Sequence, residues 1–199
     1  MRVQSCFNSR MERKRLLITC FEPFGGRTTN ASRDAVFALP DVVGAFEVQR
    51  LCLPVVFGQA AEIALAEIKR LRPDVVMCVG EASGRTAITP EMVAINLRYA
   101  RMPDNAGNVP LDEPVLKGGE NALFSTLPVR AMAEAVCEAG LPGDVSYSAG
   151  VYVCNDLMYL MLHQLAGTGV PCGFVHVPAL GLDTECAARG LIAAIGALE

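Results

Sequence analysis

Two histidines and eight cysteines limit the chemistry that this chain of 199 residues can perform. His176 lies near the end of the apolar segment GFVHVP, where a parallel strand presents functional side chains. His163 lies beside Gln164 in a helical segment and is expected to be partly exposed. A lone histidine is usually a hydrogen-bonded core residue, so His176 needs a reactive partner before it can be assigned a catalytic role.

Cys154 is the candidate partner, because it separates an expected strand at 145–153 from an expected helix at 155–167. The backbone N–H groups and the dipole at a helix start lower a thiol pKa and can also bind an oxyanion. Cys20 ends near a strand terminus without a following helix. The remaining cysteines of the folded part fall inside expected elements and are interpreted as packing residues: Cys52, Cys78, Cys137, Cys172 and Cys186.

A catalytic Cys–His pair needs a third group that orients the imidazole. The segment 81–127 is irregular and offers five carboxylates for this role: Glu81, Glu91, Asp104, Asp112 and Glu113. Glu91 follows Pro90 and precedes an apolar stretch, so it is expected to be partly buried and to have a partner. The alternative is that Glu91 is a simple charge on a local turn.

These residues need strands and helices that bring them together. Strands are expected at 15–21, 46–55, 74–80, 145–153 and 172–178, and helices from Asn30 or Ser32 to Leu39, then at 58–71, 128–140, 155–167 and 183–197. This alternation predicts one α/β domain with a mainly parallel sheet and helices on both faces. The functional site is then expected beyond the carboxyl ends of the strands.

Composition excludes several classes of protein. The chain is 52% hydrophobic and 19% charged, which excludes global disorder, and its net charge of −4 argues against nucleic-acid binding. There is no apolar run long enough for a membrane span and no signal-peptide pattern, so a cytoplasmic protein with reduced thiols is expected. We expect Met11 to be the natural start, residues 1–10 to be a disordered or upstream arm, and 11–199 to be a single catalytic domain. The absence of a CxxC pair predicts no metal site.

Several long motifs occur in a characteristic order: ITCFEPFGGRTTNAS (18–32), VGEASGRTAITPEMVAINLRYARMPDNAGNVP (79–110), GGENALFSTLPV (118–129), GVYVCNDLMY (150–159) and FVHVP (174–178). From about Leu16 to Pro178 the chain resembles the pyroglutamyl peptidase I family of cysteine peptidases. The resemblance implies an α/β/α sandwich, removal of an N-terminal pyroglutamyl residue from peptides, no cofactor, and a homo-oligomer, either a dimer or a tetramer.

The resemblance also implies roles for individual residues. Cys154 matches the nucleophile, His176 the base and Glu91 the group that orients the base. The substrate pocket would be formed by Phe21 and Phe24, which pack on the pyrrolidone ring, by Tyr152 and Val153 before the nucleophile, and by Arg101 near the catalytic centre.

One pocket position departs from the family pattern. Glu81 stands where the family has a glutamine beside the lactam, and a carboxylate cannot donate a hydrogen bond unless it is protonated. Pairing with Arg85 or Arg101 is expected to offset its charge. The sequence also has a shortened stretch after Pro178. These departures leave two alternatives to a pyroglutamyl exopeptidase: a non-catalytic binder of small molecules or peptides, and an amidase acting on another lactam or a cyclic imide.

Overall fold

Four apolar strands form the parallel centre of the sheet in the computed structural model, which describes residues 13–199. They are β1 (Lys14–Phe21), β3 (Phe46–Leu53), β4 (Val75–Ala82) and β8 (Cys172–Pro178). The short strands β2 (Val42–Val43) and β5 (Thr89–Pro90) pair antiparallel at the two edges, giving the order β2-β3-β1-β4-β8-β5. The arm expected at residues 1–10 and the start expected at Met11 lie outside the described residues.

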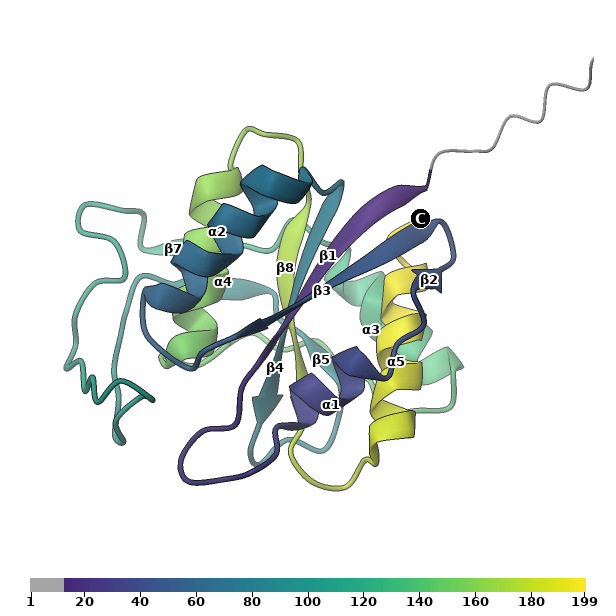
Figure 1. The fold of residues 1–199 in the computed structure, drawn as a ribbon, viewed down its shortest axis with the longest axis horizontal. Helices are drawn as coiled ribbons and strands as arrows, with labels where there is room; N and C mark the ends of the chain where they lie inside the picture. Colours follow the sequence, from purple (N-terminus) through teal and green to yellow (C-terminus); the bar gives the residue numbers. More distant parts are fainter. Residues whose placement is uncertain (1–12) are drawn as a thin grey trace, which may run out of the picture.

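Helices cover both faces of this sheet (Figure 1). The helices α1 (Ala31–Phe37), α3 (Val129–Glu138) and α5 (Thr184–Gly196) lie on one face, while α2 (Gln59–Leu71) and α4 (Val153–Leu165) lie on the other. A separate antiparallel pair, β6 (Val93–Ile95) and β7 (Ala122–Phe124), packs beside α4. The predicted α/β class with a mainly parallel sheet is confirmed. None of the helices within residues 13–199 is both long and apolar enough to cross a bilayer.

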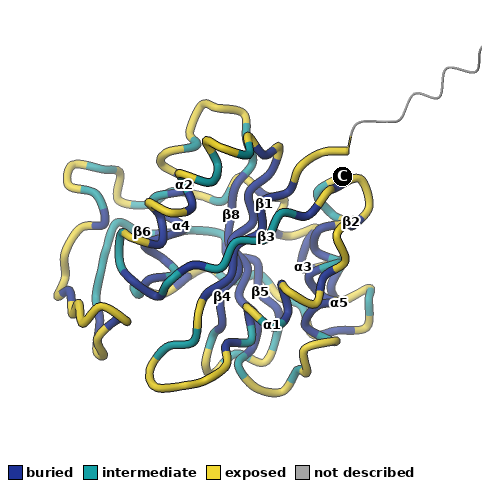
Figure 2. Tube along the Cα trace, viewed as in Figure 1, coloured by how far each residue is buried: buried dark blue, intermediate teal, exposed yellow. Residues whose placement is uncertain are grey.

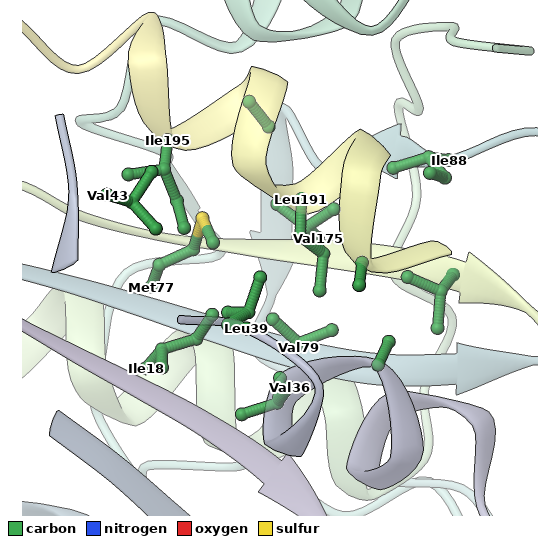
Figure 3. Packing of buried hydrophobic residues seen from close by; sticks show 14 of the residues in the cluster. Ile18, Val36, Leu39, Val43, Met77, Val79, Ile88, Val175, Leu191 and Ile195 are labelled. Carbon is green, nitrogen blue, oxygen red and sulfur yellow. The ribbon is translucent and has the colours of Figure 1, made fainter. Parts of the chain in front are cut away.

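Burial on both faces explains why the central strands are continuously apolar. The tube in Figure 2 is buried along the middle of the sheet and exposed mainly at helix surfaces and loops. Figure 3 shows one of the two cores, in which Ile18, Met77 and Val175 project from the strands toward Val36 of α1 and Leu191 of α5. The strands are therefore held rigidly at the edge where functional side chains are expected.

Two helix starts follow from side chains that bind free backbone N–H groups. The Asn30 side chain accepts a hydrogen bond from the Ser32 N–H at 3.0 Å and caps α1. The Asp183 carboxylate accepts one from the Cys186 N–H at 2.7 Å and caps α5. Asn30, one of the two caps considered for α1, is therefore confirmed.

The strand predicted at 145–153 is wrong. Serine side chains in this segment bind the local backbone: the Ser146 hydroxyl accepts from the Ser148 N–H at 3.3 Å, and the Ser148 hydroxyl accepts from the Gly150 N–H at 3.2 Å. Gly150 also has a positive φ of 79°. Local bonds of this kind compete with a strand ladder, so only an isolated bridge between Glu91 and Ser146 forms. Helix α4 consequently begins at Val153, earlier than predicted.

Candidate active site

The nucleophile candidate lies over the backbone of β4. Cys154 is in the first turn of α4, not at a strand end, and it keeps partial solvent exposure. A Cβ built on Gly80 would be only 2.9 Å from the Cys154 Sγ and 2.7 Å from Cζ of Phe174. Gly80 pairs in register with His176 on β8. The sulfur therefore sits over the residue adjacent to His176 in the sheet, a close approach that requires glycine at position 80.

The imidazole of His176 is bound to a fully buried carboxylate. Its Nδ1 lies 2.6 Å from Oε1 of Glu91, and the two residues are 4% and 0% exposed. The edge strand β5 brings Glu91 there, because Thr89 pairs with His176 and the Glu91 N–H donates to the Phe174 carbonyl at 2.8 Å. The expected contact between Glu91 and His176 is present.

The charge states of this pair follow from its surroundings. Burial alone would raise the pKa of Glu91, but the His176 hydrogen bond, the nearby Ser146 hydroxyl and the Arg85 charge together hold it below its ordinary value. Burial lowers the pKa of His176, and the opposing effect of Glu91 does not overcome it. At neutral pH the carboxylate is ionised and the imidazole is neutral. Because an ionised carboxylate only accepts hydrogen bonds, Nδ1 carries the imidazole proton and Nε2 is free to act as a base.

The expected low pKa of the Cys154 thiol is wrong. Burial raises the pKa of Cys154 to about 12, with a further increase from the Glu91 charge, and Arg85 offsets only part of this. The start of α4 does not outweigh the loss of water around the sulfur. At neutral pH the Cys154 thiol is therefore neutral, like the His176 imidazole.

Two buried polar residues that follow Cys154 fix the start of α4. The Asn155 side chain accepts from the Ile95 N–H at 2.9 Å and donates to the carbonyls of Ile95 and Leu97 at 2.8 and 3.0 Å. Asp156 accepts from the Gly58 N–H at 2.8 Å and from the Arg98 guanidinium at 2.5 Å. Neither residue was predicted from the sequence. The signal was available, since two polar residues open an otherwise apolar helix.

Aromatic rings gather around Tyr152, two residues before Cys154. Phe24 and Tyr152 are half-buried with ring centroids 6.4 Å apart, and Phe57 meets Tyr152 edge-on at 5.2 Å. Phe21 is only 2% exposed and packs on Phe174, whose ring in turn lies 4.7 Å from His176. The two expected ring faces therefore differ: Phe24 is accessible to a ligand, whereas Phe21 supports the ring beside the imidazole.

The remaining predicted pocket residues occupy different environments. Val153, the first residue of α4, is fully buried in the core. Arg101 is exposed on the loop that joins β6 and β7. This loop projects from the body of the molecule (Figure 1). The other carboxylates considered for the triad do not contact His176: Asp104 is buried within that loop, and Asp112 and Glu113 are exposed.

Glu81 lies on the α1 side of β4 and does not point toward Cys154, because it alternates with Gly80 along the strand. Its side chain is 1% exposed, pairs with the Arg27 guanidinium and accepts from the Ala31 N–H at 2.6 Å. The expected pairing with Arg85 or Arg101 is wrong, since Arg85 binds Glu91 instead. The Glu81 charge is neutralised by the loop that carries Phe24.

Among residues 13–199, no three histidine, cysteine or acidic side chains gather in a way that could hold a metal ion. A hollow of about 600 Å³ lies at the amino end of β8, lined by Phe124, Leu165 and Val170, away from the triad residues. At the carboxyl edge of the sheet, Cys154, His176 and Glu91 supply a thiol, an imidazole and a carboxylate.

Parallel α/β folds that gather these three groups at one edge of the sheet are found in the class of hydrolases that use cysteine as nucleophile. Sequence comparison specifies the group within this class. The chain belongs to the pyroglutamyl peptidase family, whose sequence profile matches residues 14–187.

Individual relatives agree with this assignment. The chain is 46% identical to the pyrrolidone-carboxylate peptidase of Levilactobacillus brevis, over 92% of this chain and 97% of the relative, and 48% identical to that of Erwinia tasmaniensis, over 84% and 79%. The crystal structure of pyroglutamyl peptidase I from Bacillus amyloliquefaciens matches with a TM-score of 0.90 and 36% identity, covering 94% of this chain and 97% of that one. A mutant pyrrolidone carboxyl peptidase from Pyrococcus furiosus matches with a TM-score of 0.87 and 35% identity, covering 92% and 97%.

Proposed function

We propose that this protein hydrolyses the bond after an N-terminal L-pyroglutamyl residue of a peptide, with Cys154 as nucleophile, His176 as general base and Glu91 as the orienting carboxylate. The observation that carries the proposal is the 2.6 Å contact between His176 and Glu91 next to the register position over which the Cys154 sulfur lies. Family membership supports the substrate class.

The first half-reaction forms a covalent intermediate. Nε2 of His176 takes the thiol proton as the sulfur attacks the pyroglutamyl carbonyl carbon, and Glu91 stabilises the imidazolium that results. Negative charge moves to the carbonyl oxygen, where the free N–H groups in the first turn of α4 stabilise it. The imidazolium then protonates the departing amine, the C–N bond breaks, and a thioester remains on Cys154.

The second half-reaction releases the product. His176 takes a proton from water as the water oxygen attacks the thioester carbonyl. The C–S bond breaks, pyroglutamate leaves, and the proton returns to the sulfur. Each turnover consumes one water molecule and restores the neutral thiol–imidazole pair.

Substrate preference follows from the character of the approach to the sulfur. A pyroglutamyl terminus is cyclised and carries no ammonium group, so half-buried apolar rings can accept it without leaving a charge unpaired. Phe24 and Tyr152 supply such rings. Glutamyl and alanyl termini keep their ammonium group and are disfavoured.

The test is a panel of fluorogenic amides carrying pyroglutamyl, prolyl, glutamyl or alanyl groups, assayed with the wild type and with Cys154→Ser. We expect turnover of the pyroglutamyl amide alone, and a loss of several orders of magnitude in the serine variant because an alcohol is a much poorer nucleophile. Tight binding without turnover would support the non-catalytic binder. Turnover of another lactam or a cyclic imide, without the pyroglutamyl amide, would support the alternative amidase. A cytoplasmic location and a homo-oligomeric state stay predictions.

A further inference from the structure

Arg85 joins two parts of the site that are distant along the chain, the segment 89–91 and Ser148. Its guanidinium donates to Oε1 of Glu91 at 2.5 Å, the same oxygen that binds Nδ1 of His176 at 2.6 Å. It also donates to the Thr89 hydroxyl, and it reaches the Ser148 carbonyl at 2.8 Å. Its side chain is 25% exposed, whereas that of Glu91 is fully buried.

We propose that Arg85 is a positioning residue for catalysis, which holds Glu91 in place and whose charge sets the pH range in which the Cys154–His176 pair is active. This inference rests on the proposed function and adds Arg85 to the three residues named there, Cys154, His176 and Glu91. Arg85 acts through Glu91 and takes no part in bond making.

The geometric part of this role concerns the approach to Cys154. The Ser148 carbonyl belongs to the segment that leads into α4, and this segment lacks the ladder of a regular strand. The Arg85 guanidinium binds both that carbonyl and the Glu91 carboxylate. It therefore couples the position of Glu91 to the position of helix α4, which carries Cys154. The fork of Arg can bind two acceptors in fixed directions, which the single ammonium of Lys cannot do.

The electrostatic part has a definite sign. The charged and titratable groups near this pair are Arg85, Glu91, His176 and Cys154, with Cys78 and the Tyr152 phenol near the sulfur and the hydroxyls of Thr89 and Ser146 near the carboxylate. Arg85 is the permanent cation among them, and it lowers the pKa of Glu91, of His176 and of the Cys154 thiol. Removal of its charge must therefore move each of these titrations to higher pH.

The expected size of the shift follows from the shared oxygen. Nη1 of Arg85 lies 2.5 Å from Oε1 and Nδ1 of His176 lies 2.6 Å from it, so these two nitrogens are at most about 5 Å apart. At that distance a partly exposed cation shifts a neighbouring titration by roughly one pH unit.

The experiment compares Arg85→Gln, which removes the charge, with Arg85→Lys, which keeps it. Arg50→Gln is the matched control, because Arg50, like Arg85, binds one carboxylate and two further oxygens. Its partners are the Asp41 carboxylate and the carbonyls of Val36 and Leu39, none of which belongs to the site. Two pH profiles are measured for each protein: kcat/KM on the pyroglutamyl amide, and the rate of Cys154 alkylation by iodoacetamide, followed by mass spectrometry of the labelled peptide. Thermal melting establishes that each variant is folded.

For Arg85→Gln we expect the limbs of the kcat/KM profile that fall within the measurable pH range to move up by roughly one pH unit, and Cys154 alkylation at a fixed pH to slow about tenfold. Arg85→Lys should restore the position of the limbs while kcat stays below the wild type, because the Ser148 contact is lost. Arg50→Gln should lower the melting temperature and leave both profiles unmoved.

The proposal is overturned if the limbs and the alkylation profile of folded Arg85→Gln coincide with those of the wild type, which would make Arg85 a purely structural residue. It is also overturned if the lysine variant shifts as far as the glutamine variant. Alkylation requires no turnover of the pyroglutamyl amide, so a failed substrate assignment leaves the test of Arg85 intact.

Discussion

Gly80→Ala is the smallest change that should separate the fold from the chemistry. The added methyl group would be 2.7 Å from Cζ of Phe174 and 2.9 Å from the Cys154 sulfur, whereas ordinary contacts begin near 3.4 Å. The ring and the sulfur must therefore retreat by about 0.5–0.7 Å, at an overpacking cost of about 1–3 kcal/mol. A nucleophile displaced on this scale loses on the order of 10²-fold in rate.

The assay combines kcat/KM on a pyroglutamyl amide, Cys154 alkylation and thermal melting. Gly196→Ala is the control, because a Cβ at that position in α5 meets nothing within 4 Å. In a Cys154→Ala background the sulfur is absent, so Gly80→Ala should cost less stability there than in the wild type. Wild-type kcat/KM in Gly80→Ala, or an equal stability cost in both backgrounds, would show that the sulfur does not lie over Gly80.

Three further predictions concern the carboxylates. Glu91→Gln should lower kcat on the order of 10²–10⁴-fold with a smaller change in KM, because the carboxylate stabilises His176 most when the imidazolium forms; steady-state kinetics would contradict this if only KM changed. Glu81→Gln should keep kcat/KM within about threefold, whereas Glu81→Ala should cost about 1–3 kcal/mol by leaving Arg27 and a buried N–H unpaired, measured by urea unfolding. Hydrogen bonds outweigh burial and hold the pKa of Asp104 below its ordinary value in the folded protein. Asp104 therefore stabilises the fold above its unfolded-state pKa, and this stabilisation is lost as the pH falls through its folded-state pKa. The melting-temperature difference between the wild type and Asp104→Ala should narrow on acidification.

Much of the fold is predictable from local signals. The strands predicted at 15–21 and 172–178 agree with β1 and β8 to within one residue at each end. Parallel strands that are buried on both faces are continuously apolar, and short continuous apolar runs therefore mark them in the sequence. The segment 145–153 was wrongly predicted to be a strand, because its β-branched and aromatic residues are typical of strands. The outcome there depends on serine hydroxyls binding nearby N–H groups and on an edge of β8 already occupied by β5.

The identities of the candidate site residues could be predicted from the sequence, but their pKa values and ion-pair partners could not. Cys154, His176 and Glu91 could be named from spacing and resemblance, and the structure brings Glu91 to His176. The thiol pKa could not be derived, because it depends on how much water the surrounding side chains remove. The ion-pair partners of Arg85 and Arg27 could not be predicted either, because they depend on how the chain folds. Glu81 and Arg27, for example, are 54 residues apart in the sequence.

The place of β8 in the chain has a consequence for folding. His176 and Glu91 are 85 residues apart, and β8 is the last strand to be synthesised although it pairs between β4 and β5. A ribosome-bound chain that ends before residue 172 contains β1, β3 and β4, but it lacks β8 and therefore His176. Long-range strand insertion of this kind is a slow step, so recovered peptidase activity should lag behind recovered helical signal during refolding. With His176 as the proposed base, we expect the enzyme to be inactive until its sheet is complete.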